Sequence, residues 1–132
     1  MSIQYSGNLR CEAVHSQSQT LIETDAPLDN KGKGERFSPT DLLCTSLATC
    51  ILTTMAIAAE ERNWKFEGVH AEIEKIMNPS PRRIGEIKIH FIFPDLGYDD
   101  IMKGKIQRYA HACPVSRSLH PEVLQTISFE FK

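Results

Sequence analysis

The sequence predicts an α+β fold in which antiparallel sheets wrap around one long, buried central helix. Period-two apolar patterns near both ends of the chain indicate half-buried strands, and the run 42–59 carries no charge. The predicted order is strands, helix, strands, helices, strand, as expected for sheet packed on a buried helix. Because 132 residues fall within the usual single-domain range, we expect one domain over 1–132.

The first predicted elements are two strands and an exposed loop. A strand is expected over 3–15, because its apolar or small residues fall on odd positions: Ile3, Tyr5, Leu9, Cys11 and Ala13. Residues 20–25 are expected to form its partner strand. The segment 26–34 is rich in turn-forming and charged residues, which predicts an exposed loop.

The central helix has a clear start signal. Ser38 supplies an N-cap hydroxyl, Pro39 suits the first helical position, and Asp41 supplies a carboxylate at the third. The uncharged stretch 42–59 implies that all faces of this helix are shielded from water. A transmembrane span is the alternative, but five Ser and Thr residues favour a buried core helix.

The second half of the chain predicts a hairpin, two helices and a last strand. The hairpin strands are expected at 68–77 and 84–93 around a proline-containing turn, with Ile87, Ile89, Phe91 and Phe93 on one face. Helical character follows over 98–112, and Pro114 begins a second short helix. A strand over 123–131 alternates Ile127, Phe129 and Phe131 with polar residues.

The net charge and the cysteine pattern limit which binding partners and which cellular compartment we expect for this protein. A net charge of −2, from 15 basic and 17 acidic residues, gives no reason to expect nucleic acid or membrane as a partner. The sequence does not begin with a basic segment followed by an apolar one. We therefore expect no secretory signal and a cytoplasmic location. The four cysteines form no C-x-x-C pair and the five histidines show no ligand spacing, so we expect no metal and no cofactor. A functional cysteine here should be reactive rather than structural.

Two cysteines are candidates for chemistry. Cys50 lies midway along the uncharged helix, where a cysteine often packs as a small hydrophobe, and Cys44 shares that alternative. Cys113 precedes a proline at a predicted helix N-terminus, which stabilises a thiolate, and Arg117 lies one turn on. An unreactive capping thiol is the alternative for Cys113. His111 lies two residues earlier, which suggests a Cys-His nucleophile pair as a further alternative. Nothing else in the pattern favours such a pair.

Three motifs in this order resemble the OsmC/Ohr (osmotically inducible protein C/organic hydroperoxide resistance) family over nearly the whole chain. They are Ser38-Pro39-Thr40-Asp41-Leu42-Leu43, Ser46-Leu47-Ala48-Thr49-Cys50, and Ala112-Cys113-Pro114-Val115 with Ser118-Leu119. The resemblance implies an intertwined homodimer with two active sites at the subunit interface. It also implies that Cys50 attacks a small hydroperoxide as a thiolate, that Cys113 resolves the sulfenic acid as a disulfide, and that a dithiol or lipoylated-protein reductant restores both thiols.

The resemblance further implies an activating arginine. Because an apolar environment disfavours a thiolate, family members supply an arginine held by a carboxylate at the start of the central helix. Arg10 is the nearest match for this arginine, and Arg36 is the alternative. Family members place glutamate directly after the motif proline, whereas this chain has Thr40 and then Asp41. Asp41 is therefore a candidate anchor, although helix capping alone would also explain it.

The sequence leaves three functional hypotheses. The first is a thiol peroxidase for hydroperoxides, including organic ones, because Leu47, Ile51 and Met55 would line an apolar site. The second is a redox-sensing or ligand-binding protein that keeps the fold and the thiols but turns over slowly. The third is a structural or ligand-carrying dimer with unreactive cysteines.

Overall fold

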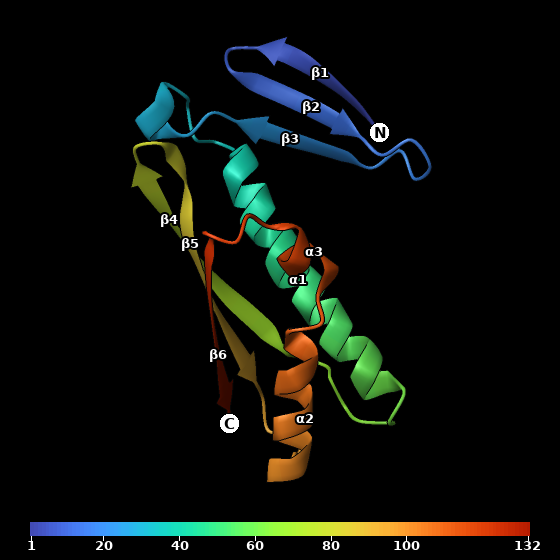
Figure 1. The fold of residues 1–132 in the computed structure, drawn as a ribbon. Coiled ribbons are helices and arrows are strands. Elements are labelled where there is room, and N and C mark those ends of the chain that lie inside the picture. The colour runs from blue at the N-terminus through green and yellow to red at the C-terminus, as the bar shows by residue number, and fades with distance from the viewer. The chain divides into compact units, whose positions relative to one another are not determined.

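The chain forms two compact units. The computed structural model describes all 132 residues, and they divide into Met1–Leu43 and Cys44–Lys132. The first unit holds a three-stranded sheet, and the second holds another three-stranded sheet with helices (Figure 1). This arrangement of two sheets and one long helix confirms the predicted α+β class.

The first sheet is an antiparallel meander. Its strands β1 (Ser2–Gly7), β2 (Arg10–Val14) and β3 (Leu21–Asp25) are hydrogen-bonded in chain order. The prediction of one strand over 3–15 is wrong, because Asn8 and Leu9 form a two-residue turn with φ of 53° and 61°. Gly7 pairs with Arg10 across that turn. A β-bulge between Tyr5 and Gly7 then shifts the register, so that Tyr5 pairs with Cys11 and the odd residues of both strands share one face.

That shared face of the first sheet is apolar and uncovered within its unit. Pairing across β1, β2 and β3 places Ile3, Ala13 and Ile22 in one row. Ile3 is 75% exposed and Ile22 is 47% exposed. Tyr5 lies on the same face and is 60% exposed.

Helix α1 (Pro39–Glu60) begins where the sequence predicted. The backbone N–H of Ser38 donates to the Asp41 carboxylate at 2.8 Å, and the backbone N–H of Asp41 donates to the Ser38 hydroxyl at 3.1 Å. This reciprocal pair is a capping box, which satisfies backbone donors that the first helical turn leaves open. The loop before the helix contains a short 3-10 helix, η1 (Leu28–Asn30).

Hydroxyl groups are accommodated in α1 by bonds to its own backbone. Thr49, Thr53 and Thr54 donate to the carbonyl oxygens four residues earlier, at 2.8 to 2.9 Å. The helix meets the length and hydropathy of a membrane span, with a mean hydropathy of 1.9, but a core helix of a soluble protein meets them as well. Within the second unit α1 leaves one uncharged stripe exposed, formed by Ser46, Thr49, Thr53 and Ile57.

The second sheet is mixed rather than antiparallel. Strands β4 (His70–Pro79) and β5 (Arg82–Phe93) form the predicted antiparallel hairpin. Strand β6 (Leu124–Phe131) pairs with β5 in parallel, which corrects the prediction of antiparallel sheets. The physical reason is the crossover through α2 (Asp100–Ala110) and α3 (Pro114–Ser118), which returns the chain to the end of the sheet from which β5 started.

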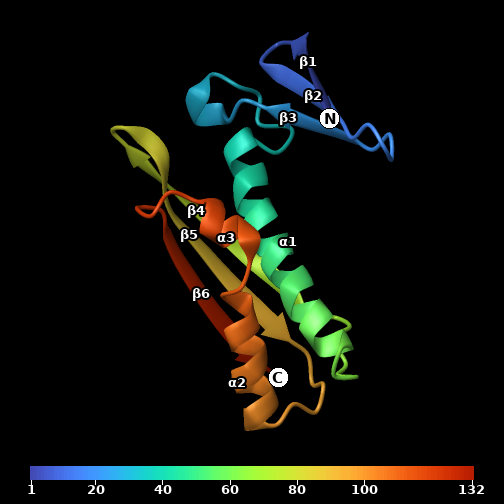
Figure 2. The same ribbon diagram turned by 45° about the vertical axis from the view of Figure 1, so that its right-hand side comes forward.

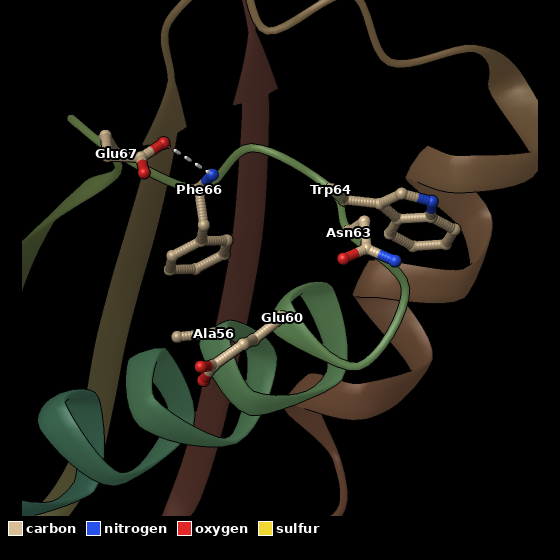
Figure 3. A pocket seen from close by; sticks show the side chains of 6 residues that line it. All are labelled: Ala56, Glu60, Asn63, Trp64, Phe66 and Glu67. Carbon is tan, nitrogen blue, oxygen red and sulfur yellow. Dashed lines mark hydrogen bonds between the residues drawn. The ribbon is translucent and has the colours of Figure 1, made fainter.

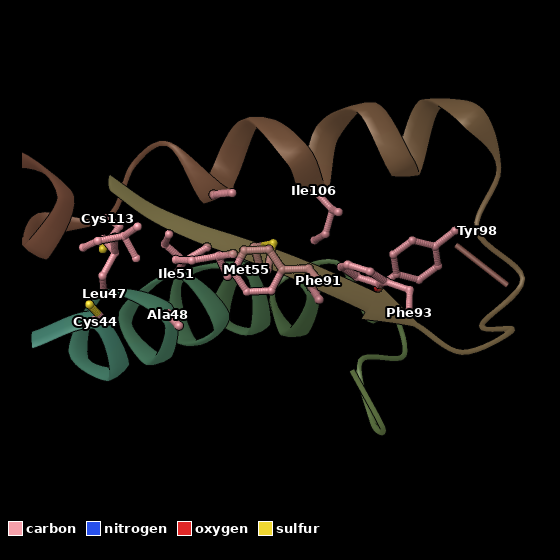
Figure 4. Packing of buried hydrophobic residues seen from close by; sticks show 14 of the residues in the cluster. Cys44, Leu47, Ala48, Ile51, Met55, Phe91, Phe93, Tyr98, Ile106 and Cys113 are labelled. Atoms are coloured by element: carbon pink, nitrogen blue, oxygen red, sulfur yellow. The ribbon is translucent and has the colours of Figure 1, made fainter. Parts of the chain in front are cut away.

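The core of the second unit lies between this sheet and the helices on one of its faces (Figure 2). Figure 4 shows the side chains of α1 and α2 meeting those of β5. The fully buried members include Leu47, Ile51 and Met55 from α1, Ile106 from α2, and the predicted face of β5: Ile87, Ile89, Phe91 and Phe93. Phe91 stacks on Phe129 at 5.5 Å between ring centroids, which ties β6 into the same core.

Candidate functional site: two thiols in contact

Cys50 is held at the middle of α1. Its side chain is partly buried and packs against the core cluster. Its backbone carbonyl oxygen accepts a hydrogen bond from the Thr54 hydroxyl at 2.8 Å. Leu47 and Ile51, which lie beside Cys50 on the helix, are fully buried. The thiol is therefore fixed by a rigid helix and keeps partial access to its surroundings.

Cys113 is held at the N-terminus of α3. It is the N-cap residue, Pro114 follows it at the first helical position, and its side chain is fully buried. Helix α3 is tied to β6, because the Ser116 hydroxyl donates to the side-chain oxygen of Gln125 at 2.6 Å and the Gln125 amide donates to the Ser116 carbonyl at 3.3 Å. These bonds give the thiol of Cys113 a fixed position.

The structure brings the two predicted redox cysteines together. The thiols of Cys50 and Cys113 share a hydrogen bond. Burial, followed by this hydrogen bond, raises the pKa of Cys113 above its ordinary value. The backbone N–H groups of Val115 and Ser116 oppose the rise, although neither forms a full capping bond to the sulfur. Cys113 is thus a neutral thiol at neutral pH.

Arg10 lies in the first unit and is held by two carboxylates. Its Nε and one terminal nitrogen bind the two Asp25 oxygens at 2.6 and 2.8 Å, and that terminal nitrogen also binds Glu35 at 2.9 Å. The Glu35 backbone N–H donates to Asp25 at 3.1 Å. The Asp25 side chain is only 3% exposed, and the hydrogen bonds from Arg10 lower the pKa of its carboxyl despite the opposing effect of burial.

Sequence reasoning missed Asp25 and Glu35 as partners of Arg10. Arg10 is directly opposite Asp25 in the β2–β3 register, so correct strand pairing would have revealed the first partner. Glu35 comes from the loop before α1, whose path no periodicity predicts. The hydrogen bonds of Arg10 described above go to Asp25 and Glu35. The anchoring of Arg10 by Asp41 therefore stays a prediction.

The other predicted charged residues have local partners. Arg36, the alternative activator, binds Glu23 at 2.7 Å and the Glu35 carbonyl at 3.0 Å. His111 is the C-cap residue of α2 and is exposed. Arg117 lies in the last turn of α3 and is exposed.

Asp41→Asn tests the two roles of the Asp41 carboxylate. If capping is its role, the free energy of unfolding should fall by about 1 kcal/mol or less, because asparagine still accepts a hydrogen bond and only the charge is lost. Peroxide consumption should then persist. Urea unfolding and the thiolate absorbance measure both effects, and Ser38→Ala is the matched control because it removes the other half of the capping box. Loss of thiolate absorbance in Asp41→Asn but not in Ser38→Ala would assign Asp41 to the chemistry.

Comparison with known proteins connects this fold to one family. Residues 32–128 match the sequence profile of a family described as OsmC-like protein. A crystal structure from Psychrobacter arcticus, assigned provisionally to the osmotic stress and detoxification response, is 43% identical, with a TM-score of 0.93. That match covers 98% of this chain and 93% of the other. No curated protein matches the chain in sequence.

Two more distant structures share the fold. An organic hydroperoxide resistance protein OsmC from Legionella pneumophila is 16% identical, with a TM-score of 0.73 over 98% of this chain and 95% of that one. An organic hydroperoxide resistance protein from Vibrio cholerae, also a provisional assignment, has captopril bound in one of its active sites. It is 17% identical, with a TM-score of 0.71 over 97% of this chain and 89% of that one.

Proposed function

Because this chain belongs to the OsmC-like family, as its match over residues 32–128 and its 43% identical relative show, we propose that it is a cysteine-based peroxidase that reduces hydroperoxides. The observation that carries this proposal is the contact between the thiols of Cys50 and Cys113. The two cysteines are 63 residues apart in the sequence. Both are free thiols, so no disulfide bond explains why their side chains meet. A contacting pair is what reversible disulfide chemistry requires.

The proposed reaction has three steps. The Cys50 thiolate attacks the outer oxygen of the O–O bond, so that Cys50 becomes a sulfenic acid and the peroxide leaves as an alcohol after taking a proton. The Cys113 sulfur then attacks the Cys50 sulfur, which forms the disulfide and releases water. A dithiol reductant returns both cysteines to thiols by exchange and is itself oxidised to a disulfide.

The protonation of Cys113 supports these roles. A thiol whose pKa is raised stays neutral at neutral pH and is a poor first nucleophile. It is nevertheless placed to donate its proton toward the sulfur of Cys50. This placement supports attack by Cys50 and resolution by Cys113.

The part of α1 around Cys50 carries no charge, since no charged residue follows Asp41 in the helix until Glu60. Leu47, Ile51 and Met55, which the sequence suggested as the lining of an apolar site, are fully buried in the core and do not line an open site. Captopril is a small thiol compound, so its presence in an active site of the Vibrio cholerae protein supports access of small thiols to such sites in this fold. The proposal includes a cytoplasmic location, where dithiol reductants are maintained.

Catalytic consumption of cumene hydroperoxide tests the proposal. With dithiothreitol or a lipoylated protein as the donor, many equivalents of peroxide should disappear per protein chain. Peptide mapping after one equivalent without a donor should find a Cys50–Cys113 disulfide. A single stoichiometric oxidation without turnover would favour a redox sensor instead, and unreactive thiols would reject both.

We expect a homodimer that persists on dilution. Within their own units, the apolar face of the first sheet and the uncharged stripe of α1 are exposed, and surfaces of this kind are normally covered in a soluble protein. Sedimentation velocity from about 100 µM down to about 1 µM should show one species of twice the chain mass, as expected when folding and association are linked. A folded monomer at the lowest concentration would contradict a site shared between subunits.

A further inference from the structure

Strand β6 carries one polar side chain on its core-facing side. The inward positions of β6 alternate with exposed ones and hold Gln125, Ile127, Phe129 and Phe131. The last three are apolar and pack against the core cluster. Within the sheet, Gln125 pairs with Ile87 of β5, which is fully buried. A side-chain amide at such a position is unfavourable unless its polar atoms are hydrogen-bonded.

The hydrogen bonds of the Gln125 side chain go to one residue of α3. Its Oε1 accepts the Ser116 hydroxyl at 2.6 Å, and its Nε2 donates to the Ser116 carbonyl at 3.3 Å. The other serine of this helix, Ser118, bonds within α3, because its hydroxyl donates to the Pro114 carbonyl at 2.9 Å. The polar residue on the inner face of β6 therefore serves the connection to α3.

Helix α3 depends on such external contacts for its position. It has only five residues, and a helix of this length is not stable by itself. The backbone N–H of Arg117 donates to the Cys113 carbonyl at 3.4 Å, which is long for a helical bond. Apolar side chains of α3 also pack on the core, but such contacts are non-directional and do not fix the rotation of the helix. The two directional bonds between Ser116 and Gln125 do so.

Ser116 connects Gln125 to the thiol of Cys113. Gln125 holds its hydroxyl and its carbonyl, and its backbone N–H interacts with the Cys113 sulfur. This N–H and that of Val115 lower the pKa of Cys113 in opposition to burial. The same sulfur shares a hydrogen bond with Cys50. A shift of Ser116 would therefore displace the Cys113 sulfur from that of Cys50.

We propose that Gln125 and Ser116 are positioning residues for the resolving step, an inference that rests on the proposed peroxidase function and deepens it. By holding α3 on β6, they keep the Cys113 sulfur within reach of Cys50. In this step the Cys113 sulfur bonds to the sulfur of the Cys50 sulfenic acid, the S–O bond breaks, and the hydroxide takes the Cys113 proton and leaves as water. The first attack on the peroxide needs neither residue. Gln125 thus determines how long the sulfenic acid is exposed to further oxidation.

The equilibrium of the Cys50–Cys113 disulfide with dithiothreitol tests the positioning without any peroxide. Full-length protein is equilibrated with mixtures of oxidised and reduced dithiothreitol, the remaining thiols are alkylated, and the disulfide is quantified by peptide mapping. Gln125→Leu, which is similar in size and suits a core-facing position, should lower the equilibrium constant by about tenfold or more, because the two thiols are no longer held together. Ser116→Ala removes one of the two bonds and should lower it by about threefold.

Two control variants separate positioning from general effects. Ser118→Ala removes a hydroxyl that bonds within α3, and Glu67→Gln changes a side chain that accepts the Phe66 backbone N–H at 3.2 Å beyond the C-terminal end of α1 (Figure 3). Both should leave the equilibrium constant unchanged. An unchanged constant in Gln125→Leu and Ser116→Ala, with or without a loss of stability, would overturn the proposal, as would an equal fall in Ser118→Ala. Ser116→Ala decides the question if Gln125→Leu does not fold.

Peroxide then separates the two chemical steps. Gln125→Leu should consume the first equivalent of cumene hydroperoxide as fast as the unchanged protein. With excess peroxide, it should accumulate sulfinic acid at Cys50 at about tenfold lower peroxide concentrations, because the sulfenic acid is resolved more slowly. A slower first step without additional sulfinic acid would overturn the assignment to the resolving step. If the unchanged protein consumed no peroxide, the peroxidase proposal would fail, and the dithiothreitol equilibrium would still decide the positioning of Cys113.

Discussion

Replacement of Cys50 by serine should reduce peroxide turnover by on the order of 10³-fold or more, because it removes the only proposed attacking sulfur. A serine hydroxyl at this position is neutral at neutral pH and reacts poorly with O–O bonds. Cumene hydroperoxide consumption with excess dithiothreitol measures the loss. The fold should be retained, since serine is close in size to cysteine and position 50 is only partly buried.

Cys113→Ser is the matched control for Cys50→Ser. It keeps the attacking sulfur and removes the resolving one, so one equivalent of peroxide should leave Cys50 as a sulfenic or more oxidised acid. Intact-mass analysis distinguishes this from a disulfide by the added oxygen. If Cys50→Ser retains full turnover while Cys113→Ser does not, the two roles are reversed.

Arg10→Ala should slow peroxide attack at neutral pH by on the order of tenfold or more, because a nearby cation favours a thiolate by about one to three pK units. The thiolate population, followed by ultraviolet absorbance across pH, should decrease in parallel. Dimer stability should change little if Arg10 serves chemistry. The carboxylates of Asp25 and Glu35 hold the guanidinium in a fixed position within the first unit.

Arg36→Ala is the control for Arg10→Ala, because Arg36 is the alternative activator and its guanidinium binds a different carboxylate, Glu23. An unchanged thiolate titration in Arg10→Ala together with a shifted one in Arg36→Ala would reject Arg10. A large fall in stability without any change in the thiolate titration would assign Arg10 to the packing of the first sheet.

Much of the fold could be predicted because local rules determine it. The Ser38 and Asp41 signal located the start of α1, and the alternation of Ile87, Ile89, Phe91 and Phe93 identified the buried face of β5. The Asn8–Leu9 turn was missed, since the β-bulge between Tyr5 and Gly7 offsets the change of parity that a two-residue turn introduces. The parallel pairing of β5 with β6 was missed as well, because alternation reports which face a residue occupies but not the direction of the strand.

The candidate site could be predicted only in part. The motifs around Cys50 and Cys113 identified both cysteines, and the structure places their thiols in contact. Their roles depend on burial, which raises the pKa of Cys113 in opposition to the helix N-terminus, and no local pattern reports burial at a loop-to-helix junction. The partners of Arg10 depend on strand register and on a loop, both of which are set by contacts distant in sequence.

The parallel pairing of β5 with β6 has a consequence for biosynthesis. Phe129 and Phe131 stack on Phe91 and Phe93, so the aromatic part of the core is incomplete until the last strand has left the ribosome. A nascent chain that ends before residue 124 would expose β5 along one edge and the faces of both phenylalanines, which is a strong template for aggregation. Folding of the second unit should therefore wait until β6 has been synthesised, and chaperone binding to the emerging chain should be strongest between the synthesis of β5 and that of β6.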